Sequence, residues 1–171
     1  MCETDHYDFP SSYLVYVFGL SKVAEFVDTV FLVLRKRPLI QLHVQHHIIT
    51  FWFTWMANVY SYRINGSGYW FATMNVIVHS IMYTYYALAA AGYGRALAAA
   101  KLNMVITTIQ IVQMVMGIIV LFTTQSCPVT SPLYFALGLA MYALYLILFA
   151  KLFIDKYIAR SPKRGSKQKI K

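Results

Sequence analysis

Charged side chains are scarce in this sequence. Asp, Glu, Lys and Arg make up 12% of its 171 residues, whereas about a quarter is usual for a soluble domain. Hydrophobic residues reach 59%, and the mean hydropathy is +0.54. This composition excludes an ordinary soluble domain and predicts an integral membrane protein.

The apolar residues are gathered in blocks about as long as a membrane-spanning helix, which needs about 20 residues. Five such blocks are present, at residues 12–34, 42–62, 68–91, 102–122 and 133–154. The N-terminal segment "MCETDHYD" is acidic and lacks the basic region of a cleavable signal peptide. The predicted fold class is therefore all-α integral membrane, with five transmembrane helices in one domain.

Acidic residues are the scarcer charge, with six Asp and Glu against 15 Lys and Arg, so the net charge is +9. Basic chains often bind nucleic acid, but the distribution of the charge argues against that function here. The basic residues gather in linkers on one side of five spans and in the tail: Arg35, Lys36, Arg37, Arg95, Lys101 and eight more from Lys151 to Lys171. Because cytosolic segments are enriched in Lys and Arg, the C-terminus is predicted to be cytosolic and the N-terminus lumenal.

Two further features bear on the compartment. The tail ends "KQKIK", which resembles the cytosolic retrieval signal of endoplasmic-reticulum membrane proteins, although a generic basic tail would also be attracted to anionic lipid. Cys2 and Cys127 both fall on the predicted lumenal side. They either form a disulfide in that oxidising compartment or stay as two free thiols.

Polar side chains interrupt several of the predicted spans, and such residues are costly in a membrane and mark candidate sites. In span 12–34, Lys22, Glu25 and Asp28 recur every three residues beside Thr29, on one side of a helix. Their alternative role is a polar clasp between helices. The later spans add a second and a third stripe, where the alternatives are an aromatic core and interhelical hydrogen bonds: Asn75, His79, Tyr83 and Tyr86, then Thr107, Gln110 and Gln113.

Three histidines share one face of the span at 42–62. His43, His46 and His47 are offset by three and four residues and lie near its predicted cytosolic end. Imidazole serves as a metal ligand, a general base or a nucleophile. Together with the other stripes, the histidines predict a polar cleft that opens to the cytosol and suits a hydrophobic molecule with a polar head.

Two chemistries use histidines in this way. Di-iron membrane desaturases and hydroxylases contain HxxHH, but the five histidines here, with His6 on the opposite side, are too few unless Glu25 and Asp28 add ligands. The other chemistry is acyl transfer, in which an imidazole attacks a thioester and holds the acyl group as an acyl-imidazole. A second base then promotes a carbon nucleophile that takes the acyl group.

Four motifs resemble those of the very-long-chain fatty acid elongase family. "KVAEFVDT" at 22–29 is similar to KxxExxDT, "HVQHH" at 43–47 to HxxHH, "HSIMYTYY" at 79–86 to HxxMYxYY and "TTIQIVQ" at 107–113 to TxxQxxQ. They occur in the family's order and spacing, and the resemblance covers residues 12–157.

The resemblance implies a 3-ketoacyl-CoA synthase (very-long-chain 3-oxoacyl-CoA synthase) of the endoplasmic-reticulum membrane. Such an enzyme condenses a long-chain acyl-CoA with malonyl-CoA and lengthens the chain by two carbons. The resemblance further implies an acyl tunnel inside a helical barrel, no metal or other cofactor, and a ketoreductase, a dehydratase and an enoyl reductase as partners.

Carried over by position, His46 and His79 are expected to contact the acyl carbon, with His46 as the acylated residue and His43 and His47 as base or orienting groups. Asn75 is expected to orient the imidazole of His79. The residues expected to shape the site or bind substrate are Lys22, Glu25, Asp28, Thr29, Tyr83, Tyr86, Thr107, Gln110 and Gln113. By charge and side alone, the CoA phosphates are expected near Arg35, Lys36, Arg37, Arg95 and Lys101.

The resemblance also implies seven spans, so two helices that precede the first span are expected to be missing from this sequence. The chain is then a fragment, or a reduced member whose tunnel is open along one wall. A different function is also open, that of a non-catalytic acyl-CoA-binding subunit. The expected organisation is a lumenal segment at 1–11, a transmembrane domain at 12–157 and a cytosolic basic tail at 158–171.

Overall fold

The computed structural model describes residues 9–60, 66–126 and 131–159, and the regular elements in these ranges are all helices. They are α1 (Phe9–Ala24), α2 (Phe26–Leu34), α3 (Gln41–Tyr60), α4 (Gly66–Leu88), η1 (Ala89–Tyr93), α5 (Gly94–Ala99), α6 (Leu102–Thr124), α7 (Pro132–Phe153) and η2 (Ile154–Ile158). The all-α part of the predicted fold class is confirmed for these ranges. Cys2 and Cys127 lie outside them, so their pairing stays a prediction.

The first predicted span is divided into two helices at Glu25. The backbone N–H of Asp28 donates to the carbonyl oxygen of Glu25, three residues earlier, at 3.1 Å. This turn is tighter than the four-residue turn of an α-helix and separates α1 from α2. The charged stripe of the sequence therefore lies at the junction of two helices.

Helix α2 ends through left-handed backbone at Lys36, whose φ is +52°. The N–H of Lys36 bonds to the carbonyl of Val33, and the N–H of Arg37 bonds to the carbonyl of Leu32, both at 2.9 Å. These two bonds satisfy carbonyl groups that the helix end leaves unpaired. Pro38 follows and cannot continue the helix.

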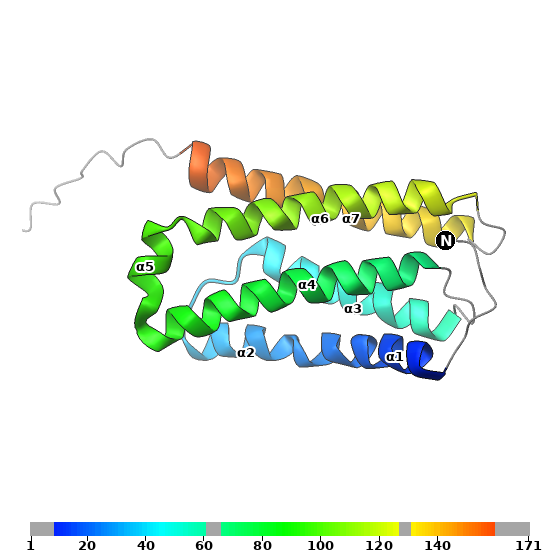
Figure 1. Cartoon of the computed structure of the whole chain (residues 1–171), viewed down its shortest axis with the longest axis horizontal. Coiled ribbons are helices and arrows are strands. Elements are labelled where there is room, and N and C mark those ends of the chain that lie inside the picture. The colour runs from blue at the N-terminus through cyan, green and yellow to red at the C-terminus, as the bar shows by residue number, and fades with distance from the viewer. Residues whose placement is uncertain (1–8, 61–65, 127–130, 160–171) are drawn as a thin grey trace, which may run out of the picture.

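The long helices run side by side and form an elongated bundle (Figure 1). Helix α6 packs against α4 and α7, α3 packs against α7 and α1, and α1 packs in turn against α4. At one end η1 and α5 join α4 to α6, where Gly92 adopts a φ of +101°. Each of the helices α1, α3, α7, α6 and α4 thus packs against the next in this order, and α4 packs against α1 again. The barrel that the resemblance implies stays a prediction.

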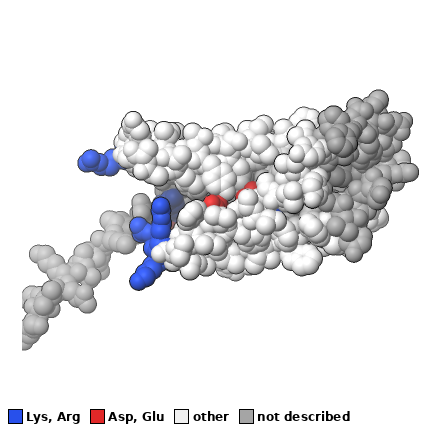
Figure 2. Space-filling model, turned by 90° about the horizontal axis from the view of Figure 1, so that it is seen from below, with Lys and Arg blue, Asp and Glu red and all other residues white. Residues whose placement is uncertain are grey.

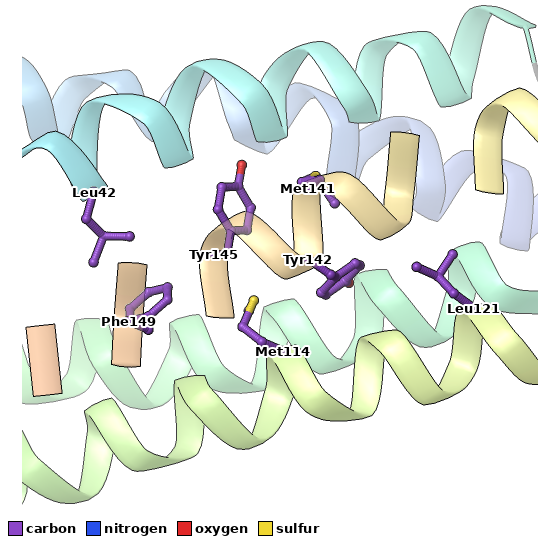
Figure 3. Packing of buried hydrophobic residues seen from close by; sticks show 7 residues of the cluster. All are labelled: Leu42, Met114, Leu121, Met141, Tyr142, Tyr145 and Phe149. Atoms are coloured by element: carbon purple, nitrogen blue, oxygen red, sulfur yellow. The ribbon is translucent and has the colours of Figure 1, made fainter. Parts of the chain in front are cut away.

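The apolar core lies between α3, α6 and α7. Figure 3 shows its buried cluster, formed by Leu42, Met114, Leu121, Met141, Tyr142, Tyr145 and Phe149. Tyr142, Tyr145 and Phe149 recur at helical spacing along one face of α7. Outside this core, large apolar side chains such as Leu14, Leu34 and Ile147 remain well exposed, as expected of a surface that faces lipid.

Two helical stretches are long and apolar enough to cross a membrane, Leu102–Thr124 and Pro132–Ile158. The first has 23 residues, which at the rise of an α-helix is about 35 Å, against about 30 Å for the hydrocarbon core of a bilayer. This fits a membrane protein. The three other predicted crossings stay predictions, and the first of them is made of two consecutive helices, α1 and α2.

Basic side chains collect at one end of the bundle (Figure 2). Apart from Lys22, the described Lys and Arg residues belong to the segments at that end: Arg35, Lys36, Arg37, Arg95, Lys101, Lys151 and Lys156. Away from that end, the described residues visible in Figure 2 are mostly uncharged, and acidic atoms are recessed near the middle of the face. One end of the bundle therefore carries the charge that the sequence assigned to the cytosolic side.

Candidate active site

A buried ammonium group ties α1 to α4. Lys22 is 3% exposed, and its Nζ donates to Glu25 Oε1 at 2.5 Å and to Asn75 Oδ1 at 2.6 Å. Because a buried charge is costly unless paired, these two acceptors account for a lysine inside the bundle. Asn75 was expected to orient His79, but its hydrogen bond is with Lys22.

The next residues of the stripe tie α2 to α4 and α3. The hydroxyl of Tyr83 on α4 donates to Asp28 Oδ2 at 2.5 Å. The hydroxyl of Thr29 pairs with Nε2 of His43 at 2.9 Å. Each polar residue of the KxxExxDT segment therefore contacts a residue from another helix. These contacts hold the helices together as a clasp. They also fix the position of the neighbouring histidines.

The imidazoles of α3 and α4 form one cluster. Ring centroids are 4.4 Å apart for His43 and His47 and 5.6 Å for His46 and His47. His46 and His79 stack across the two helices at 6.0 Å. Residues 33 positions apart in sequence are thereby brought together, while their expected contact with the acyl carbon stays a prediction.

Glu25 is the carboxylate next to this cluster. Its Oε1 lies 3.4 Å from Nδ1 of His79, and its Oε2 lies 3.9 Å from Nδ1 of His47. The Nδ1 atoms of His46, His47 and His79 are buried and make no hydrogen bond to the described residues. For His47 and His79, the polar group nearest to these buried nitrogens is therefore the carboxylate of Glu25.

Three of these residues could hold a metal ion. Glu25, His46 and His79 each place one ligand atom within 4.8 Å of the others. However, the ammonium of Lys22 already occupies Glu25 Oε1 and would repel a second cation. The expectation that the site works without a metal is not tested by this geometry and stays a prediction.

The histidines face a cavity of about 930 Å³. Its polar lining combines the three stripes: Asp28, His43, His46, His47, Asn75, His79, Tyr86, Asn103, Thr107, Gln110 and Gln113. Its apolar lining comes from α2, α3, α4, α6 and α7, and includes Phe31, Leu42, Met82, Ile106, Phe149 and Leu152. A cavity that joins a polar cluster to an apolar wall suits a molecule with one reactive polar group and a long apolar part.

Several expected site residues lie outside the cavity lining. Lys22, Glu25, Thr29 and Tyr83 support the lining residues through the contacts above rather than forming the wall. Of the five basic residues expected near phosphates, Arg35 lines the cavity and the other four do not: Lys36, Arg37, Arg95 and Lys101. Their role as phosphate ligands stays a prediction.

Sequence reasoning missed several residues of the site, among them Asn103, which lines the cavity, and Tyr145 and Lys156. Tyr145, 2% exposed, donates from its hydroxyl to the backbone oxygen of His46 at 3.2 Å and pairs with Thr50 at 2.9 Å. Figure 3 shows its hydroxyl directed toward α3. Lys156, like Arg35, lines the cavity and belongs to the basic end of the bundle. The signal for Lys156 was present as a lysine just after the last span, but it was counted only as part of a basic tail.

Comparison with known proteins places the chain in a family. Residues 1–165 match the model of the ELO family, described as GNS1/SUR4. The chain belongs to this family. It is 44% identical over 158 residues to fatty acid elongase 3 of Trypanosoma cruzi and 44% identical over 173 residues to fatty acid elongase 1 of Trypanosoma brucei brucei. It is also 40% identical over 172 residues to human very long chain fatty acid elongase 6. The resemblance to the elongases is thereby confirmed.

The matches cover most of this chain but only part of each relative. They span 88%, 95% and 95% of the chain, and 51%, 54% and 62% of the three relatives in the same order. The chain thus spans about half the length of the first curated relatives that it matches. No solved structure matches it at a significant level.

Proposed function

We propose that this ELO-family chain carries the condensation site of a fatty acid elongase. The reaction joins a long-chain acyl-CoA to malonyl-CoA and yields a 3-ketoacyl-CoA two carbons longer, with release of CO2 and CoA. The observation that carries the proposal is the meeting of His46 and His79 at 6.0 Å beside a cavity with a polar lining and an apolar lining.

The first half-reaction is attack of the His46 imidazole on the thioester carbon. The carbon–sulfur bond breaks, the acyl group stays on His46, and the proton lost by the imidazole leaves with CoA. Thr107, Gln110 and Gln113 line the same cavity. The side-chain amides of Gln110 and Gln113 are donors of the kind that stabilises the negative oxygen of such an intermediate, whereas the hydroxyl of Thr107 donates to the backbone oxygen of Asn103.

The second half-reaction forms the carbon–carbon bond. Malonyl-CoA loses CO2, and the electron pair of the broken bond becomes a carbanion that attacks the acyl carbon. His46 leaves and takes up a proton from solution. His79, stacked on His46, is placed to act as the second base, and His43 and His47 act as further base or orienting groups.

The shape of the cavity suits the two ends of the substrate. The apolar lining residues accommodate the acyl chain, while Arg35 and Lys156 lie at the basic end and suit the phosphates of CoA. With that end in the cytosol, the N-terminus is lumenal and the chain is a multi-pass protein of the endoplasmic-reticulum membrane. Its product would pass to a ketoreductase, a dehydratase and an enoyl reductase.

The test is turnover in membranes that lack their own elongase. The chain is supplied with palmitoyl-CoA and radiolabelled malonyl-CoA, beside His46→Ala and His79→Ala. We expect a labelled 3-ketoacyl product two carbons longer, lost in both variants. Asp155→Asn serves as the control, because Asp155 is exposed on η2 and outside the cavity lining.

Absence of product separates the proposed enzyme from the binding subunit. The chain is assayed alone and with any further coding sequence that precedes it, over a range of acyl lengths. If no form turns over malonyl-CoA but the chain still retains labelled palmitoyl-CoA, the condensation proposal is wrong and a non-catalytic acyl-CoA-binding role replaces it.

A further inference from the structure

The carboxylate of Glu25 lies close to two imidazoles that belong to different helices. Glu25, at the junction of α1 and α2, directs Oε1 to Nδ1 of His79 at 3.4 Å and Oε2 to Nδ1 of His47 at 3.9 Å. The side chain of Glu25 is 10% exposed. Its charge therefore acts at short range in a site where water screens it little.

The position of the carboxylate decides which ring nitrogen carries the proton. A neutral imidazole has one N–H and one lone pair. Nδ1 of His79 and Nδ1 of His47 are buried and make no hydrogen bond to the described residues, so Glu25 is the acceptor that the structure offers to both. A proton on Nδ1 is attracted by this carboxylate, whereas a lone pair on Nδ1 is repelled by it.

Lys22 keeps the carboxylate in place. Its ammonium donates to Glu25 Oε1 at 2.5 Å and is itself fixed by Asn75 Oδ1 at 2.6 Å. Asn75 thus positions Lys22, Lys22 positions Glu25, and Glu25 lies next to His79 and His47.

We propose that Glu25 is a positioning residue that holds His79 and His47 in the tautomer with the proton on Nδ1. Nε2 of His79 then keeps its lone pair. Since Nδ1 is buried and His79 lines the cavity, Nε2 is the ring nitrogen that meets a ligand. The effect of this lone pair on turnover rests on the proposed function, whereas the assignment of the tautomer does not.

The direct test is nitrogen NMR on the full chain, labelled with 15N at histidine and embedded in lipid bilayers. The signals of His79 and His47 are assigned by their loss in His79→Asn and His47→Asn. In the unaltered protein we expect the pattern of a neutral ring protonated at Nδ1 for both residues. A proton on Nε2 of His79, or on both of its nitrogens, overturns the proposal without reference to any variant at Glu25.

Variants at Glu25 distinguish the effect of the carboxylate charge from the effect of the side chain's size. In Glu25→Gln, the amide can donate to Nδ1 of His79, so we expect the proton to move to Nε2. Glu25→Asp keeps a carboxylate, and we expect the Nδ1 pattern to be retained. Asp28→Asn is the matched control for lost charge in the same stripe, and we expect it to leave the tautomer of His79 unchanged. If Glu25→Gln folds and keeps the Nδ1 pattern, the inference is wrong.

Turnover supplies the second readout. We expect Glu25→Gln to lower kcat by about 100-fold, the lower range for loss of acid–base assistance, while KM for acyl-CoA changes less than kcat. Glu25→Asp should recover part of kcat, which a purely structural role for the side chain would not predict. A chain that shows the tautomer shift but never condenses malonyl-CoA keeps this inference and refutes the proposed function. A chain that condenses malonyl-CoA but shows no tautomer shift in Glu25→Gln supports the proposed function and refutes this inference.

Discussion

His46 on α3 and His79 on α4 stack with an interplanar angle of 28° and ring centroids 6.0 Å apart. Both line the same cavity. Two imidazoles at this spacing can share the steps of acyl transfer, because one can hold the acyl group while the other acts as a base. The hydroxyl of Tyr145, which donates to the backbone oxygen of His46, fixes one side of this pair.

The first prediction concerns an acylated histidine. Incubation with palmitoyl-CoA in the absence of malonyl-CoA should leave the acyl group on His46, because the second half-reaction has no carbon nucleophile. Rapid quenching, proteolysis and mass spectrometry of the peptides should locate the group. His46→Gln should remove it, and His79→Gln should still form it. An acyl group found on His79 and absent from His46 would reverse the two roles.

The second prediction concerns metal. We expect turnover to be unchanged after treatment with strong chelators, because the ammonium of Lys22 lies 2.5 Å from Glu25 Oε1 and opposes a second cation at that oxygen. Elemental analysis of the purified protein should find iron and zinc far below one ion per chain. Retention of one equivalent of metal, lost together with activity on chelation, would restore the oxygenase interpretation.

The part of the fold that sequence predicted is the part set by local pattern. Apolar blocks long enough to span a bilayer gave helices close to the observed α3, α4, α6 and α7. The break at Glu25 escaped this reasoning, because an apolar block does not reveal a tighter backbone turn inside it. The packing order of the helices also escaped it, since pairing between helices depends on contacts far apart in sequence.

The site was predicted as a set of residues but not as a set of contacts. The family resemblance placed His46 and His79 at one site. The offset of four residues between Asn75 and His79 suggested that Asn75 orients that imidazole, whereas in the structure Asn75 accepts a hydrogen bond from Lys22. Which acceptor a buried ammonium chooses depends on how far α4 lies from α1, which sequence spacing does not contain. Tyr145 was missed because an aromatic residue in an apolar helix gives no sign of where its hydroxyl points.

The third prediction concerns recognition of the CoA phosphates by Lys156. Lys156→Gln should raise KM for acyl-CoA by about two- to fivefold, the value of one exposed ion pair, with little change in kcat. The difference from the unaltered protein should shrink as salt is added, because ions screen exposed charges. Initial rates over a range of acyl-CoA concentrations at two ionic strengths would measure both effects.

Lys151→Gln is the control for that experiment. Lys151 is also exposed near the end of α7 but does not line the cavity, so its replacement should leave KM unchanged. Equal effects of the two variants would mean that the basic end acts only through its overall charge, and that Lys156 makes no separate contact with the substrate.

The last prediction concerns stability and is independent of catalysis. A Cβ atom at Gly117 on α6 would clash with the ring of Tyr142 on α7, and that ring is 5% exposed and has little room to move. Gly117→Ala should therefore destabilise the protein by about 1–3 kcal/mol despite the better helix propensity of alanine. At Gly94 the nearest atom is 3.8 Å away, so Gly94→Ala should be tolerated. Thermal unfolding in detergent would compare Gly117→Ala with Gly94→Ala. Combining Gly117→Ala with Tyr142→Leu should restore part of the lost stability. An unchanged Tm for Gly117→Ala would show that α6 and α7 do not pack this closely.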